Sequence, residues 1–167
     1  MEFQLKSLSR DAIPDALERA HRYRLLNEPW QAESICMDIL RVEPANQSAL
    51  VTLLLAITDQ FGSEVPVSRA REVVRSIQGE YEKAYYAGII CERSARAHMK
   101  QRLPGGNGIA YREFVEAMEC YERAESKRPP GNDEAILRWN TCARTLMRHA
   151  ELRHEPEEER MEAVLGE

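Results

Sequence analysis

The chain has 167 residues, and its composition is that of a folded domain with a mixed surface charge. Hydrophobic residues make up 43% of the chain and charged residues 31%, so there are enough apolar side chains to form a core. The formal net charge of −5 argues against a nucleic-acid binder, because such proteins carry a basic face. We also expect no membrane segment, since the longest apolar run, 53–57, is far shorter than the ~20 residues that a spanning helix needs.

We expect neither a secretory leader nor a metal site formed by cysteines. Residues 1–6 lack the basic stretch and apolar run of a secretory signal peptide, and we therefore expect a soluble, cytoplasmic protein. Zinc sites usually contain closely spaced ligand pairs, but no cysteine here lies in a C-x-x-C pair. We expect the cysteines to be small buried side chains in a reducing compartment; they are Cys36, Cys91, Cys120 and Cys142.

Every element along the chain is predicted to be a helix. Apolar residues recur with helical periodicity, and no alternating run of β-branched residues is bounded by turns. Proline and glycine separate the helices, because proline cannot continue an α-helix and glycine favours turns. In chain order the separators are Pro29, Pro44, Gly62 with Pro66, Gly79, the loop 104–108 and the run 129–131.

The C-terminal half contains the clearest predicted helices. We expect them over about 81–100, 111–126 and 133–153, with Asn132 as the N-cap of the last one. Together with the four helices that precede Gly79, they give about seven main helices arranged in hairpin pairs. The predicted fold class is therefore all-α.

Two helices share one spacing of residues. In each helix the pattern begins with an alanine. The next two residues of the pattern lie four and seven positions after it, and a proline lies twelve positions after it. The two sets are Ala32, Cys36, Ile39 and Pro44, and Ala117, Tyr121, Ala124 and Pro129. Ala70, Val74 and Ile77 repeat the first two gaps without the proline. Small residues let neighbouring helices approach closely, and the bulky residue between them fills the remaining space.

The partner helices carry a matching pattern. Ala20 is followed three residues later by Tyr23, and Gly88 three residues later by Cys91. This arrangement resembles the tetratricopeptide repeat family, whose helix–turn–helix unit has about 34 residues. The resemblance covers 13–153 and implies a right-handed superhelical stack of antiparallel helix pairs.

The resemblance also implies a domain organisation. Its parts are an N-terminal extension 1–12, repeat units 13–46, 47–80 and 81–131, a capping helix 133–153 and an acidic C-terminal tail 154–167. The third unit is longer than the first, because Gly88 and Ala117 are 29 positions apart whereas the equivalent residues of the first unit are 12 apart. It has either a longer first helix or an extended loop at about 101–110.

In repeat stacks of this family, the first helices of the pairs line a concave groove. The resulting candidate groove residues are Leu17, His21, Arg24, Val51, Leu55, Tyr85, Tyr86, Arg93, Asn140 and Arg144. The groove is expected to be apolar and aromatic in the middle with arginines at its edges, which suits a peptide or amphipathic helix with acidic flanks. For Tyr85 and Tyr86, burial in the core is an equally weighted alternative to a position in the groove.

No catalytic or cofactor-binding pattern is present. The glycine loop 104–108 is not followed by Gly-Lys-Ser/Thr, so it is not a phosphate-binding loop. The four histidines lack H-E-x-x-H spacing, and nucleophile-elbow and kinase signatures are absent. We therefore expect no enzyme activity, no cofactor and no metal site.

The resemblance implies a non-catalytic protein–protein interaction module, acting as an adaptor or in the manner of a co-chaperone. Two alternatives stay open: a chaperone for secreted bacterial proteins, and a structural protein that self-associates, for example as a homodimer. In the tail, Met161, Val164 and Leu165 share a helical face behind the acidic run 157–159. The tail is either a solvated end or a segment that folds onto the groove and competes with partners.

Overall fold

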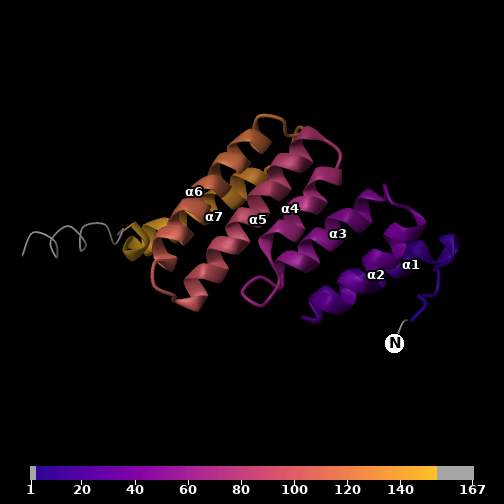
Figure 1. Ribbon diagram of the computed structural model, residues 1–167. Helices are drawn as coiled ribbons and strands as arrows, with labels where there is room; N and C mark the ends of the chain where they lie inside the picture. The colour runs from indigo at the N-terminus through magenta and orange to yellow at the C-terminus, as the bar shows by residue number, and fades with distance from the viewer. Residues whose placement is uncertain (1–2, 154–167) are drawn as a thin grey trace, which may run out of the picture. The chain divides into compact units, whose positions relative to one another are not determined.

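The computed structural model describes residues 3–153, and every regular element in that range is a helix (Figure 1). The all-α prediction is therefore confirmed for these residues. The elements are η1 (Arg10–Ala12), α1 (Ile13–Leu25), α2 (Pro29–Val42), α3 (Gln47–Thr58), α4 (Val67–Ser76), α5 (Glu80–Gln101), α6 (Gly106–Glu125), α7 (Glu134–Arg148) and η2 (Ala150–Arg153). Among the described helices, none is long and apolar enough to cross a bilayer. The predicted tail 154–167 lies outside the described residues.

The chain divides into two compact units, Met1–Gln78 and Gly79–Glu167. The first contains η1 and α1 to α4, and the second contains α5 to α7 and η2. The pairs α1–α2 and α3–α4 fall within the first two expected repeat units, and α5–α6 falls within the third apart from Glu80, the first residue of α5. The superhelix and the single domain over 13–153 stay predictions.

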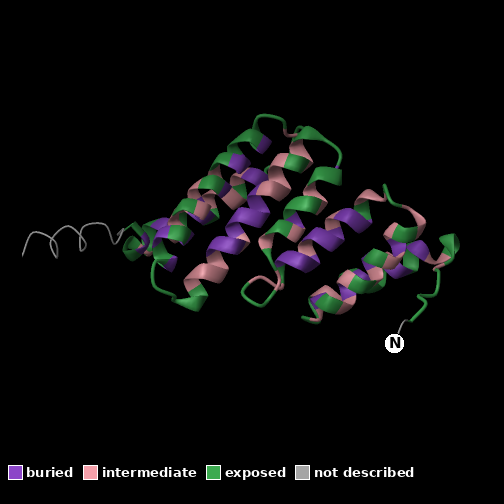
Figure 2. Cartoon of the chain, viewed as in Figure 1, coloured by how far each residue is buried: buried purple, intermediate pink, exposed green. Residues whose placement is uncertain are grey.

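In the first unit, each helix packs against the next along the chain. The most buried is α3, in which eight of 12 residues are buried (Figure 2). The small residues expected at helix contacts, Ala20, Ala32 and Ala70, are all fully buried. Their short side chains therefore lie where neighbouring helices approach closely, as the spacing predicts.

The second unit is built on a long helical pair, α5 and α6, which lie side by side (Figure 1). Of the two alternatives for the third unit, the structure shows the longer first helix rather than an extended loop at 101–110. The helix α5 runs to Gln101, and α6 already begins at Gly106. The predicted start of this helix at Tyr111 was wrong by five residues. Gly106 and Gly108 are buried in the first turn of α6, and a Cβ on Gly106 would lie 3.6 Å from the His98 carbonyl oxygen of α5.

One contact fixes the packing of α5 on α6. A Cβ atom added at Gly88 would lie 2.5 Å from Cε1 of Tyr121, closer than real Cβ atoms come to a neighbour. The Tyr121 ring therefore occupies the space that a side chain at residue 88 would need. Both residues belong to the predicted small-and-bulky pattern, and Tyr121 is fully buried.

The last predicted helix, 133–153, is shorter in the structure. The helix α7 ends at Arg148, and the separate turn η2 follows it. Asn132 was predicted to be the N-cap, but the cap position is Asp133, which makes no side-chain cap bond. Asn132 still contributes, since its Oδ1 accepts a hydrogen bond from the Glu134 amide at 3.1 Å.

Candidate binding site

The predicted groove residues of the first unit are largely occupied with contacts inside that unit. His21 Nε2 lies 2.9 Å from Thr52 Oγ1 of α3, and Arg24 Nε donates to Oδ2 of Asp59, the C-cap residue of α3, at 2.7 Å. Leu17 packs against the buried cluster around Ile13 and Ala16, while Val51 and Leu55 are half-buried on α3. The charge of Arg24 is therefore balanced by Asp59 rather than presented to a partner.

In the second unit, Tyr85 and Tyr86 lie in an aromatic cluster and are half-buried. The Tyr85 ring lies 5.2 Å from that of Tyr86 and 5.9 Å from that of Tyr121, and its hydroxyl donates to Glu134 Oε2 at 3.2 Å. Burial raises the pKa of both Tyr85 and Tyr86. Tyr85 thus contacts α7 through Glu134, and both tyrosines are partly buried and partly exposed. The remaining predicted residues are Arg93 and Asn140, both half-buried, and Arg144, which is exposed.

Sequence reasoning missed a buried carboxylate beside this cluster. Glu92 of α5 is 2% exposed. Its carboxylate accepts a hydrogen bond from the Tyr121 hydroxyl at 2.8 Å and forms an ion pair with Arg96 at 3.1 Å. Arg138 of α7 lies 3.5 Å from the same carboxylate. Burial, followed by the negative charge of Glu92, raises the pKa of Tyr121. The group joins α5, α6 and α7, and the only sequence signal for it is the Glu92–Arg96 spacing of four.

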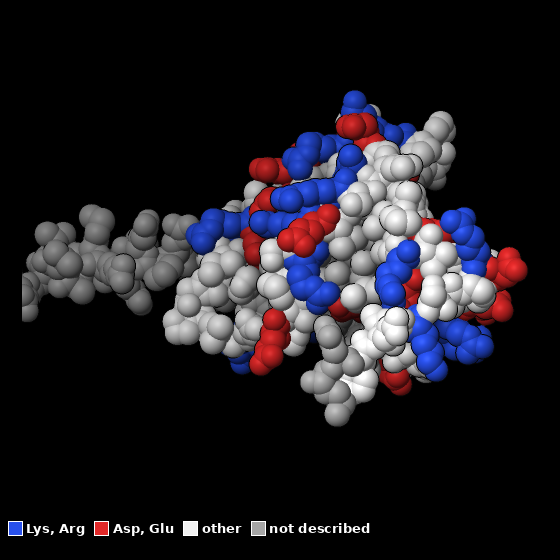
Figure 3. All heavy atoms as spheres, turned by 45° about the vertical axis from the view of Figure 1, so that its right-hand side comes forward, with Lys and Arg blue, Asp and Glu red and all other residues white. Residues whose placement is uncertain are grey.

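Polar side chains near the end of α5 are also paired. The Ser94 hydroxyl donates to Glu113 Oε1 at 2.7 Å, and His98 Nδ1 lies 2.8 Å from Glu113 Oε2. Throughout 3–153, no group of three His, Cys, Asp or Glu side chains is placed to hold a metal ion. On the face seen in Figure 3, Lys and Arg side chains stand beside Asp and Glu side chains, as the mixed composition predicts.

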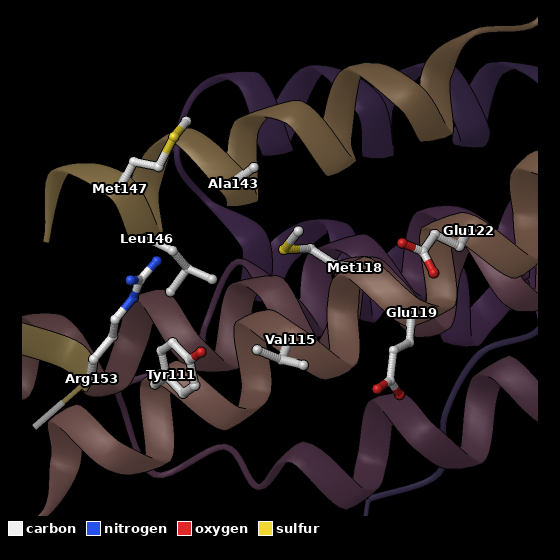
Figure 4. A pocket seen from close by; sticks show the side chains of 9 residues that line it. All are labelled: Tyr111, Val115, Met118, Glu119, Glu122, Ala143, Leu146, Met147 and Arg153. Atoms are coloured by element: carbon white, nitrogen blue, oxygen red, sulfur yellow. The ribbon is translucent and has the colours of Figure 1, made fainter. Parts of the chain in front are cut away.

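A cleft opens between α6 and α7, and Arg153 of η2 lies at one end of it (Figure 4). Its volume is about 330 Å³. The side chains that line it are Tyr111, Val115, Met118, Glu119, Glu122, Ala143, Leu146, Met147 and Arg153. None of them was among the predicted groove residues. Met118 and Leu146 lie between the two helices, and Met147 is 68% exposed, so apolar side chains reach the surface here.

The polar groups of the cleft are placed at its edges. Glu119 and Glu122 lie on the α6 side, where both are exposed. The Trp139 indole Nε1–H donates to Glu122 Oε1 at 3.0 Å, which holds that carboxylate in place. Arg153 stands at the η2 end (Figure 4). The cleft is therefore an apolar surface bordered mainly by carboxylates along α6.

Comparisons with family models, with curated proteins and with solved structures find no match to this chain. The assignment of a function therefore depends on the geometry of the residues themselves.

Proposed function

We propose that this chain is a tetratricopeptide-like repeat protein acting as a non-catalytic protein-interaction module, with its binding site in the α6–α7 cleft. The observation that carries the proposal is the apolar lining of that cleft, which includes the exposed Met147. Exposed apolar surface with a polar border is typical of binding sites. The buried small residues at the repeated spacing, such as Ala32 and Ala117, support the repeat assignment.

The partner that fits is an amphipathic helix with basic residues beside its apolar stripe. Two helices form the walls of the cleft, and a third helix packs well into such a groove. The unbranched side chains of Met118 and Met147 adapt to different apolar partners. Glu119 and Glu122 provide the opposite charge for lysine or arginine, which would favour basic partners over acidic ones.

This partner differs in charge from the one expected at the predicted groove. A partner with acidic flanks was expected at the predicted groove because Arg24, Arg93 and Arg144 were placed at the edges of that groove. Arg24 is already paired with Asp59, so its attraction for an acidic peptide is weakened. The carboxylates beside the α6–α7 cleft favour a basic peptide instead.

A binding experiment with two model peptides tests the proposal. Fluorescence anisotropy would compare a Leu/Lys amphipathic helix with a Leu/Glu helix of the same length. We expect the Leu/Lys peptide to bind more tightly, and Met147→Gln to weaken it about tenfold by removing an apolar contact. Met37→Gln is the matched control, because Met37 is 51% exposed on α2, outside the cleft. Equal losses in both variants, or no preference between the peptides, would contradict the proposal.

Self-association has support from a different surface. Leu25, Leu26 and Trp30 surround the turn between α1 and α2 and are 88%, 60% and 59% exposed. Apolar side chains so close together on a surface favour contact between two copies. If this surface forms a homodimer, sedimentation velocity will show a concentration-dependent dimer that Leu25→Ser abolishes. A monomer at all concentrations would remove this second candidate.

A further inference from the structure

The described part of the chain ends beside the α6–α7 cleft. Its last residue, Arg153, lines the cleft, so the tail 154–167 starts at this end of it (Figure 4). The cleft extends along α6 from Tyr111 to Glu122, which is about 16 Å at the rise of an α-helix. The chain from Arg153 to Met161 can span up to about 26 Å when it is extended. The tail is therefore long enough to reach every part of the cleft.

Charge distinguishes the two ends of the cleft. The carboxylates of Glu119 and Glu122 lie at the end away from Arg153 (Figure 4). The last turns of α7 carry two further exposed arginines, Arg144 and Arg148, each of which directly follows a residue that lines the cleft. An acidic segment that starts at Arg153 therefore meets arginines before it meets carboxylates, which favours its approach.

The sequence of the tail follows the same order. Its acidic run, 157–159, comes first, close to Arg153 in the chain. An apolar stripe follows and consists of Met161, Val164 and Leu165. Residues 160–165 contain one arginine and one glutamate, so this part of the tail has no net charge and the α6 carboxylates exert little repulsion on it.

We propose that the tail 154–167 folds back onto the α6–α7 cleft, where its apolar stripe covers Met147 and its acidic run lies beside the arginines. The tail then competes with partners for the cleft. This inference rests on the proposed function, because it assigns a competitor to the same site. A segment tethered beside its site has an effective concentration of about 1 mM, so a weak intrinsic affinity is enough to cover the cleft in most molecules.

Methionine oxidation by hydrogen peroxide tests the contact without any partner. Met147 is 68% exposed and Met37, in α2, is 51% exposed, so Met147 should react at least as fast if nothing covers it. In the full-length chain we expect the tail to protect Met147, which should then be oxidised more slowly than Met37. Leu165→Gln should raise the initial rate at Met147 about fivefold and leave the rate at Met37 unchanged. Peptide mapping by mass spectrometry gives both rates.

The matched control is Ala163→Gln, because residue 163 lies on the opposite face of a helix from the apolar stripe. This variant should leave the oxidation of Met147 and Met37 as in the unmodified sequence. An unchanged rate at Met147 in Leu165→Gln, or an equal rise in Ala163→Gln, would overturn the proposal.

Peptide binding tests the competition. Leu165→Gln should bind the Leu/Lys peptide about fivefold more tightly than the unmodified chain does, because its cleft is no longer covered, and Ala163→Gln should show no gain. Equal affinities of Leu165→Gln and the unmodified chain would refute competition by the tail. If none of the three proteins binds the peptide, the proposed function fails, whereas the oxidation rates still decide whether the tail covers Met147.

Discussion

The Tyr121 ring and the missing side chain of Gly88 together determine how α5 meets α6. The spacing of small and bulky residues was enough to predict that both are core positions, and the structure places them in contact. The hydroxyl of Tyr121 could not be assigned a partner in the same way. Its acceptor, Glu92, is a charged residue that ordinary patterns place at the surface, and only the packed helices show that it is buried.

The close contact at Gly88 predicts the effect of adding one methyl group. Gly88→Ala places a Cβ 2.5 Å from Tyr121, so we expect a loss of about 1–3 kcal/mol in the free energy of unfolding through overpacking. Gly108→Ala is the control, because its Cβ would meet only Arg112 Nη1 at 3.8 Å. The control should be neutral or stabilising by up to about 1 kcal/mol, since alanine favours helix. Urea denaturation measures both, and equal effects would show that the Gly88 contact is not tight.

Buried thiols and the buried tyrosine predict a loss of stability in alkali. Burial raises the pKa of Cys36 from 9.0 to about 12, so the unfolded chain releases this proton at lower pH than the folded chain. The stabilisation is complete below pH 9 and is lost as the pH rises toward about 12. Tyr121, whose pKa is raised from 10.0, has the same sign above pH 10. Urea denaturation from pH 8 to 11 should show falling stability, less steeply in Cys36→Ala; a slope unchanged by that substitution would contradict this assignment.

At the level of the helices, periodicity predicted their existence and order but not all of their ends. The glycines of 104–108 were interpreted as a loop, although Gly106 and Gly108 lie inside α6. A pattern of residues does not show where α6 begins, nor that the α5 backbone lies beside Gly106, where a Cβ would be 3.6 Å from the His98 carbonyl oxygen. In the same way, Ile77 was assigned to a helix by its spacing from Ala70 and Val74, but its backbone is extended and it is buried just after α4 ends.

Helix caps offer a test at this scale. The Asn46 side chain accepts a hydrogen bond from the Ala49 amide at 2.9 Å at the start of α3. We expect Asn46→Ala to lower the free energy of unfolding by about 1 kcal/mol, since one amide of the first turn loses its acceptor. Ser9, which precedes η1, makes no such bond, so Ser9→Ala should change stability by less than about 0.5 kcal/mol. Similar losses for both variants in urea denaturation would show that the Asn46 cap is not stabilising.

For the whole molecule, the all-helical fold was predictable from the sequence and the candidate site was not. The predicted groove took residues from α1, α3, α5 and α7, by analogy with the repeat family. The α6–α7 cleft depends instead on which side chains leave space between two packed helices and on the turn η2, which begins after α7 has ended. The spacing of residues in the sequence predicts neither the space between the two helices nor the position of η2. Met118 and Met147 look like ordinary core residues in the sequence, and only their positions beside the cleft distinguish them.

Hydrogen exchange in the presence of the Leu/Lys model peptide tests most directly whether the α6–α7 cleft is the binding site. Mass spectrometry would compare amide exchange of the full chain with and without the peptide. We predict slower exchange in α6, α7 and η2 on binding, and no change in α1 or α3. Slower exchange confined to α1 and α3, around His21 and Val51, would contradict our assignment and would favour the groove predicted from the sequence.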